Sequence, residues 1–162
     1  MKKKMNFNIK SQIYDDIHTI EYLTSLNPLS TIKDLYIQNA IFTKIMICLR
    51  DLIHKSMLYS KPINFTDDVI ITDEVKNVAD LIKFIRDALC HIDSDNHKIE
   101  QCFLTYNVIN GKQPRAMILN DIAIGSDYED DTCIIFGVQK IYYKRHILRA
   151  FEECKNNFKD IL

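Results

Sequence analysis

The fold that this sequence predicts depends most on AIFTKIMICL, residues 40–49. Its apolar residues recur on nearly every side of a helix, which is typical of a helix surrounded by other elements. Ser30 and Thr31 can cap such a helix, and Asp34 in the first turn suits the positive end of the helix dipole. We therefore expect a long, central, buried helix over about residues 31–59.

Two further helices are expected in the N-terminal half. Residues 11–27 carry apolar side chains at helical spacing and stop at Asn27-Pro28. After the break at Pro62, residues 72–93 show the most regular pattern, in which apolar residues step by three and four positions as in a bundle helix. These residues are Val75, Val78, Ile82, Ile85, Leu89 and Ile92.

The pattern changes after residue 100. FLTYNVIN alternates in the manner of a strand, and Asn110-Gly111 favours a hairpin turn because both residues tolerate positive φ. AMILNDIAIG and TCIIFGVQ follow, and a helical pattern returns over residues 143–162. We predict an α+β fold: a helical bundle of three N-terminal helices and one C-terminal helix, with a small antiparallel β-meander at about residues 100–140 inserted before the last helix.

Composition indicates a single domain spanning residues 1–162. The chain is 47% hydrophobic and 27% charged, with a net charge of -1, so an interaction with nucleic acid would have to be local. Five cysteines without a ligand spacing favour a reduced, cytoplasmic protein, and no apolar run approaches the length of a membrane span.

The segment RDALCH, residues 86–91, lies near the end of the third predicted helix. At about 100° per residue, Asp87 and His91 share the face opposite the apolar stripe, and Arg86 flanks the stripe. Asp87 could hold one ring nitrogen of His91 and leave the other for acid and base chemistry, while Arg86 could bind a phosphate. The alternative is an ordinary solvated helix end, at which a histidine complements the helix dipole.

The motif of RDALCH resembles the RX4-6H motif of the HEPN superfamily, in which a polar residue often follows the arginine. Arg86, Asp87 and His91 match it with four intervening residues, at the end of the third helix of a bundle. The resemblance covers the helices and not Glu100 to Lys140, which look like an insertion.

The resemblance implies a metal-independent endoribonuclease without a cofactor that acts as a homodimer. His91 would be the general base or acid in attack of a ribose 2′-hydroxyl on the adjacent phosphate. Arg86 would stabilise the phosphorane, and Asp87 would orient His91. Such proteins are often toxins with a nucleotidyltransferase-like antitoxin, or abortive-infection factors against phage. The alternative is a non-catalytic dimerisation or ligand-binding module.

A second cluster occurs in RDLIH, where Arg50 and His54 share one face of the central helix. Its spacing is one residue shorter than that of the family motif. We expect Arg50, Asp51 and His54 to form a structural polar network or to reach the same cleft.

The segment QKIYYKRHILR combines Lys140, Lys144, Arg145 and Arg149 with two tyrosines, as an RNA-binding groove would need. Alternatively, Lys144 and Arg145 pair with Glu152, Glu153 or the acidic loop SDYEDD. That loop lacks the spaced ligands of a calcium site, and we expect it to be solvated.

Overall fold

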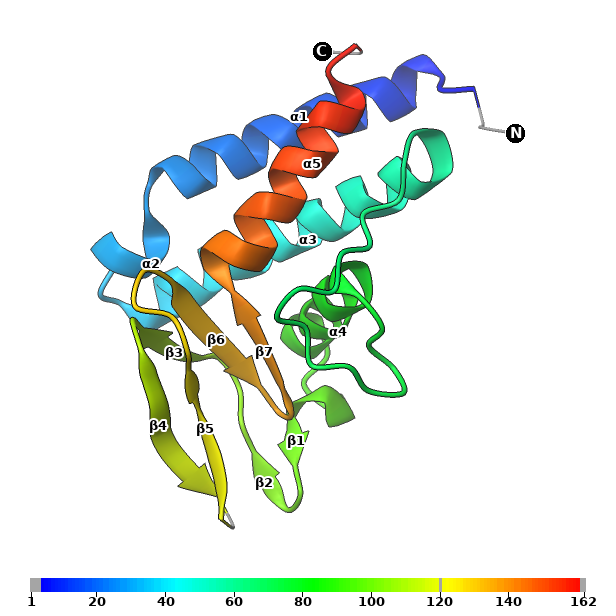
Figure 1. Ribbon diagram of the computed structural model, residues 1–162. Helices are drawn as coiled ribbons and strands as arrows, with labels where there is room; N and C mark the ends of the chain where they lie inside the picture. The colour runs from blue at the N-terminus through cyan, green and yellow to red at the C-terminus, as the bar shows by residue number, and fades with distance from the viewer. Residues whose placement is uncertain (1–3, 120, 161–162) are drawn as a thin grey trace.

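The computed structural model describes residues 4–119 and 121–160 (Figure 1). Its helices are α1 (Phe7–Ser25), α2 (Pro28–Thr31), α3 (Leu35–Tyr59), α4 (Val78–Cys90) and α5 (Arg149–Phe158), and a π-helical segment, η2 (Tyr143–Leu148), leads into α5. α1, α4 and α5 all pack against α3, so the predicted long helix is central. The predicted end of the last helix, at residue 162, lies outside the described residues.

The ends of α3 follow from its sequence, with one correction. Asp34 caps the helix, because its carboxylate accepts hydrogen bonds from the N–H groups of Tyr36 and Ile37. Ser30 and Thr31 form the short α2 instead of a cap, so the predicted start at residue 31 was wrong. One face of α3 is also open to solvent, since Ile47 is exposed in the middle of the apolar run.

α4 is shorter at both ends than the periodicity predicted. Thr72 and Val75 close a turn by two hydrogen bonds, and Asn77 caps the helix through the N–H groups of Ala79 and Asp80. The helix therefore begins at Val78 and not near residue 72. At the other end His91 leaves the helix, so Ile92, which was expected on the buried stripe, is 91% exposed.

The strands form three small antiparallel sheets within the described residues. β1 (Lys98–Ile99) pairs with β2 (Cys102–Phe103), and β4 (Gln113–Leu119) pairs with β5 (Ile122–Ser126). The third sheet has the order β3-β6-β7, from β3 (Asn107–Asn110), β6 (Thr132–Phe136) and β7 (Gln139–Tyr142). The mixed α+β class is confirmed, but a simple meander is not: Asn110-Gly111 does not join paired strands, because β3 pairs with β6.

The sheet of β3, β6 and β7 separates two apolar cores. Ile134 and Phe136 of β6 face the helices, and Cys133 and Ile135 face the smaller core beside β1, β4 and β5. A strand covered on both faces is expected to be continuously apolar, as TCIIF is. Of the cysteines, Cys48, Cys133 and Cys154 are buried and Cys90 is exposed. No helix in the described part of the chain is long and apolar enough to cross a membrane.

Candidate functional site

The candidate site is the C-terminal end of α4, where the chain leaves the helix. His91 has an extended backbone, and its N–H still donates to the carbonyl oxygen of Asp87. The carbonyl oxygen of His91 accepts a hydrogen bond from the N–H of Ser94 at 3.0 Å. This turn ends the helix and leaves the imidazole of His91 exposed beside the last turn of α4.

Asp87 contacts two cations. One carboxylate oxygen lies 2.9 Å from Nη1 of Arg86, and the other lies 3.2 Å from Nζ of Lys83. Both side chains of the Arg86–Asp87 pair are about one quarter exposed. These contacts hold Arg86 and Lys83 on the outer face of α4. The prediction was a hydrogen bond between Asp87 and the ring of His91, and the contacts of Asp87 described here are with these two cations instead.

His91 and Asp87 line one open pocket of about 810 Å³. Its walls come from the loop before α4, from α4 itself and from the turn after it: Glu74, Asp80, Lys83, Phe84, Asp87, His91, Asp93, Ser94 and Asn96. Four of these residues are carboxylates and one is a lysine, so the walls are mainly acidic. A phosphate bound here would need positive charge from Arg86, which does not line the pocket, or from a second molecule.

The second arginine and histidine cluster adjoins this pocket. Arg50 and His54 of α3 line a smaller pocket of about 240 Å³, which shares Asp80 and Lys83 with the pocket of His91. The interpretation that they reach the same surface therefore fits Arg50 and His54.

Asp51 instead belongs to an ion network between α1 and α3. It contacts Lys55, which is buried, and Nζ of Lys55 lies 3.5 Å from Asp16. Burial and a hydrogen bond to Asp51 raise the pKa of Asp16 to about 6. Burial acts against ionisation of Asp51 too, but its hydrogen bond with Lys55 holds the pKa of Asp51 below its usual value. Asp51 is therefore the ionised partner of Lys55, in a structural network.

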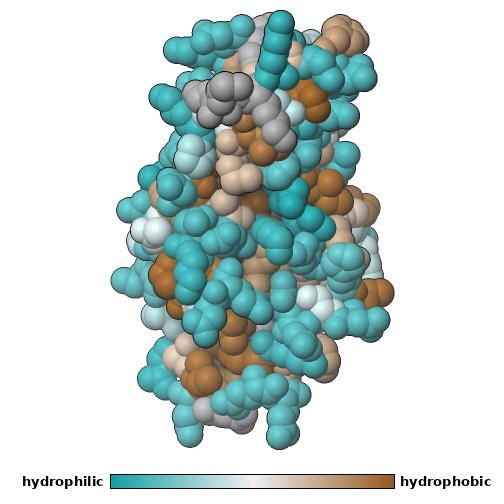
Figure 2. Space-filling view, turned by 90° about the vertical axis from the view of Figure 1, so that its right-hand side faces the viewer, coloured by the Kyte–Doolittle hydropathy of each residue, from teal (hydrophilic) through white to brown (hydrophobic). Residues whose placement is uncertain are grey.

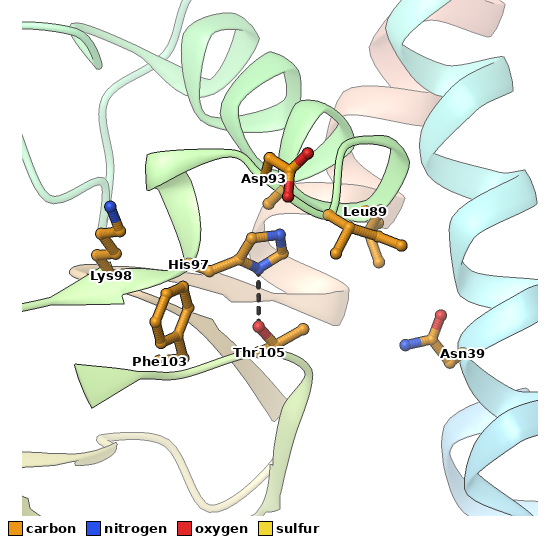
Figure 3. A pocket seen from close by; sticks show the side chains of 9 residues that line it. Asn39, Leu89, Asp93, His97, Lys98, Phe103 and Thr105 are labelled. Atoms are coloured by element: carbon orange, nitrogen blue, oxygen red, sulfur yellow. Dashed lines mark hydrogen bonds between the residues drawn. The ribbon is translucent and has the colours of Figure 1, made fainter.

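A third pocket lies on the other side of the turn after α4 (Figure 3). Its volume is about 630 Å³, and its walls come from α3, α4 and the β1–β2 segment: Asn39, Ala88, Leu89, Ile92, Asp93, His97, Lys98, Phe103 and Thr105. Asp93 lines both this pocket and the pocket of His91. The two pockets therefore meet at Asp93.

His97 also lies in this region, and no partner for it was predicted from the sequence. It is 6% exposed, its Nδ1 lies 2.7 Å from the Thr105 hydroxyl, and its Nε2 lies 3.2 Å from the carbonyl oxygen of His91. Only a donor can face a carbonyl, so Nε2 carries the proton and Thr105 donates to Nδ1. His97 thus holds the turn that carries His91. The local signal was Ser94, whose hydroxyl accepts from Asn96 N–H and begins the 3₁₀ turn η1 (Asp95–His97).

Three of the four cations of the basic segment near α5 pair with carboxylates, and the fourth contacts a backbone carbonyl. Lys140 contacts Asp127, Lys144 contacts the carbonyl of Asp130, Arg145 pairs with Asp130 and Asp131, and Arg149 pairs with Asp67 and Glu153. The structure thus has the pairing that the sequence offered as the alternative to RNA binding. The solvated-loop prediction was wrong for Asp131, which is buried because it caps the start of η2.

Most of the surface drawn in colour in Figure 2 is hydrophilic, and hydrophobic side chains reach it in separate spots. No family model, no curated protein and no solved structure matches this chain. The functional interpretation therefore rests on the residues themselves.

Proposed function

We propose that the protein is a metal-independent endoribonuclease of the HEPN type that acts as a homodimer, as a toxin or in defence against phage. A nucleotidyltransferase-like antitoxin is the expected protein partner. The observation that supports this most is the exposed His91, which shares an open pocket with Asp87 beside the Arg86–Asp87 ion pair. An imidazole and a guanidinium that reach the same phosphate would supply proton transfer and stabilisation of its charge.

In the proposed reaction, His91 of one subunit takes the proton of a ribose 2′-hydroxyl. The 2′-oxygen forms a bond to the adjacent phosphorus, and the bond from phosphorus to the 5′-oxygen breaks. Protonated His91 of the partner subunit gives its proton to the leaving oxygen. The products are a 2′,3′-cyclic phosphate and a 5′-hydroxyl, and the step needs no further reactant.

Arg86 and Asp87 have linked roles in this proposal. A guanidinium has five N–H donors, and Asp87 contacts the one nitrogen Nη1 of Arg86. The other donors can serve the anionic phosphorane. Asp87 then positions Arg86 on α4 more than it orients His91, which is a change from the role that the family resemblance implied.

Two features support a dimer. Arg86 does not line the pocket of His91, so a second copy is the simplest way to bring an arginine opposite this histidine. On α3, the exposed Tyr36, Ile47 and Met57 lie on one helical face together with Arg50 and His54. Burial of these apolar side chains between two copies would stabilise the dimer and place Arg50 of each subunit near the site.

The acidic walls of the His91 pocket favour the second candidate function, a non-catalytic dimerisation or ligand-binding module. In this alternative, Arg86 and Asp87 are a surface ion pair and His91 is a helix-ending residue. The two functions differ in what the imidazole of His91 does, and this difference can be measured.

The test is RNA cleavage by purified protein in the presence of EDTA. His91→Ala should reduce the cleavage rate by a factor of about 100 or more, the usual contribution of a general acid or base. His18→Ala is the matched control, because His18 is an exposed histidine on α1 outside the three pockets described above. Product ends should carry a 2′,3′-cyclic phosphate. If wild-type protein and His91→Ala cut RNA equally fast, the catalytic assignment is wrong.

A further inference from the structure

The third pocket, shown in Figure 3, is lined by exposed apolar side chains and by polar groups. Phe103 is 68% exposed and Ile92 is almost fully exposed, although both are large apolar side chains. Nζ of Lys98, which also pairs with Asp95, lies 5.9 Å from the centre of the Phe103 ring, within cation–π range. An exposed aromatic ring beside a cation is the combination on which single-stranded nucleic acids stack a base.

The polar groups of this pocket come from opposite walls. The amide of Asn39 projects from α3, and the carboxylate of Asp93 lies on the turn after α4 (Figure 3). His97 is held by Thr105 and by the carbonyl of His91, so both of its ring nitrogens are engaged within the protein. The amide of Asn39 can donate and accept, and its oxygen already accepts from the Thr43 hydroxyl, whereas a carboxylate such as that of Asp93 only accepts. A ligand that hydrogen-bonds to Asp93 therefore presents a donor to it.

We infer that this pocket binds one unpaired RNA base that carries an exocyclic amino group. Carboxylates accept from the amino group of cytosine and amides pair with adenine, while uracil has no exocyclic amino group. The volume of about 630 Å³ lies in the range of small-molecule sites. Cytosine, adenine and guanine, which carry this group, should bind, and uracil should bind less well.

The pocket stands next to the proposed catalytic histidine. Ile92 lines the base pocket and His91, its neighbour in the chain, lines the adjoining one, with Asp93 common to both. A nucleotide bound over Phe103 would therefore lie beside the pocket of His91, with Asp93 between the two pockets. The inference rests on the proposed ribonuclease function and adds to it which nucleotide the site prefers.

The experiment measures binding of short fluorescent oligo(rC), oligo(rA) and oligo(rU) by anisotropy, in the full-length His91→Ala protein, which leaves the RNA intact. Oligo(rC) and oligo(rA) should bind more tightly than oligo(rU). Adding Phe103→Ala should weaken binding by about tenfold or more, because a stacking partner is lost, and Phe103→Trp should preserve it. Phe7→Ala is the matched control, since Phe7 is an exposed phenylalanine on α1 outside this pocket.

Asp93→Asn tests the specificity. An amide can donate as well as accept, so this variant should reduce the preference for oligo(rC) over oligo(rU), whereas a general gain from the lost negative charge would raise both affinities equally. Equal binding of oligo(rC) and oligo(rU) by the parent protein, or equal effects of Phe103→Ala and Phe7→Ala, would overturn the inference. If the wild type and Phe103→Ala cut RNA equally fast, the inference about this pocket is wrong, while the ribonuclease function stands. The expected binding pattern without any cleavage by the wild type would instead reject the ribonuclease function and retain the pocket.

Discussion

Replacement of Asp131 by alanine should strongly destabilise the protein, because this carboxylate joins the sheet to the last helix. Its side chain is fully buried. One oxygen accepts from the N–H groups of Thr132 at 2.8 Å and Lys144 at 2.9 Å, and the other accepts from Arg145 through its N–H at 3.0 Å and its Nη1 at 3.1 Å. Lys144 and Arg145 begin the helical segment that continues as α5, where N–H groups lack helical partners.

The size of the effect follows from these contacts. Removing one partner of a buried ion pair costs about 3 to 5 kcal/mol. The side chain of Arg145 is 29% exposed, so most of this cost comes here from the N–H groups of Thr132, Lys144 and Arg145, which lose their acceptor. A typical domain has a free energy of unfolding of about 5 to 15 kcal/mol, so Asp131→Ala should fold only marginally. With a urea dependence of about 2 kcal/mol per molar, the unfolding midpoint should fall by about 1.5 to 2.5 M.

The assay is urea unfolding followed by circular dichroism. Asp130→Ala is the control, because Asp130 is the neighbouring carboxylate, pairs with the same arginine at 3.0 Å and is exposed. Exposed ion pairs contribute little, so this variant should unfold close to the wild type. If Asp131→Ala and Asp130→Ala had the same midpoint, Asp131 would not act as the helix cap described above.

Two other predictions concern the titration of buried groups. Burial lowers the pKa of His146, which accepts a hydrogen bond from Tyr142 N–H and contacts the carbonyl of Asp67. As the pH falls, the unfolded chain therefore binds the proton before the folded protein does, and the free energy of unfolding should decrease below about pH 6.5. This decrease should be smaller in His146→Gln. The pKa of Asp16 is raised to about 6, so its effect on stability has the opposite pH dependence. Its stabilising contribution is complete below about pH 4 and is lost as the pH rises through 6. Asp16→Asn should therefore be more stable than the wild type at pH 7.5 but not at pH 4. Urea unfolding at pH 7.5 and pH 4 measures the difference in stability between each variant and the wild type. A difference that does not change with pH would contradict the assignment for that residue. The cleavage and oligonucleotide-binding predictions for His91 and Phe103 are independent of these stability measurements.

The helices were predictable where local signals agreed. Tyr59 ends α3 as expected, one turn before Pro62. The start of α4 was not predictable, because Thr72 and Asn77 are both residue types that cap helices. Val78 N–H donates to the carbonyl of Phe65, a contact between loops that periodicity does not encode, and Asn77 becomes the cap.

The strand pairing and the surroundings of the site could not be predicted either, because they also depend on contacts between residues far apart in the sequence. Tyr106 has a φ of +50° and interrupts the alternation of FLTYNVIN, and Gly111 N–H bonds to the carbonyl of Asp131. The sequence placed Asp87 and His91 on an outer face, and both line a pocket there. It did not indicate His97 or Phe103, because their positions depend on how the chain folds back after α4.

The position of α5 has a consequence for synthesis of the protein. Phe151, Cys154 and Phe158 of α5 belong to the core around α3, yet they lie among the last residues described. While the chain emerges from the ribosome, α1, α3 and α4 are available well before the helix that completes their core. The nascent chain therefore carries an incompletely covered apolar surface until α5 has been synthesised.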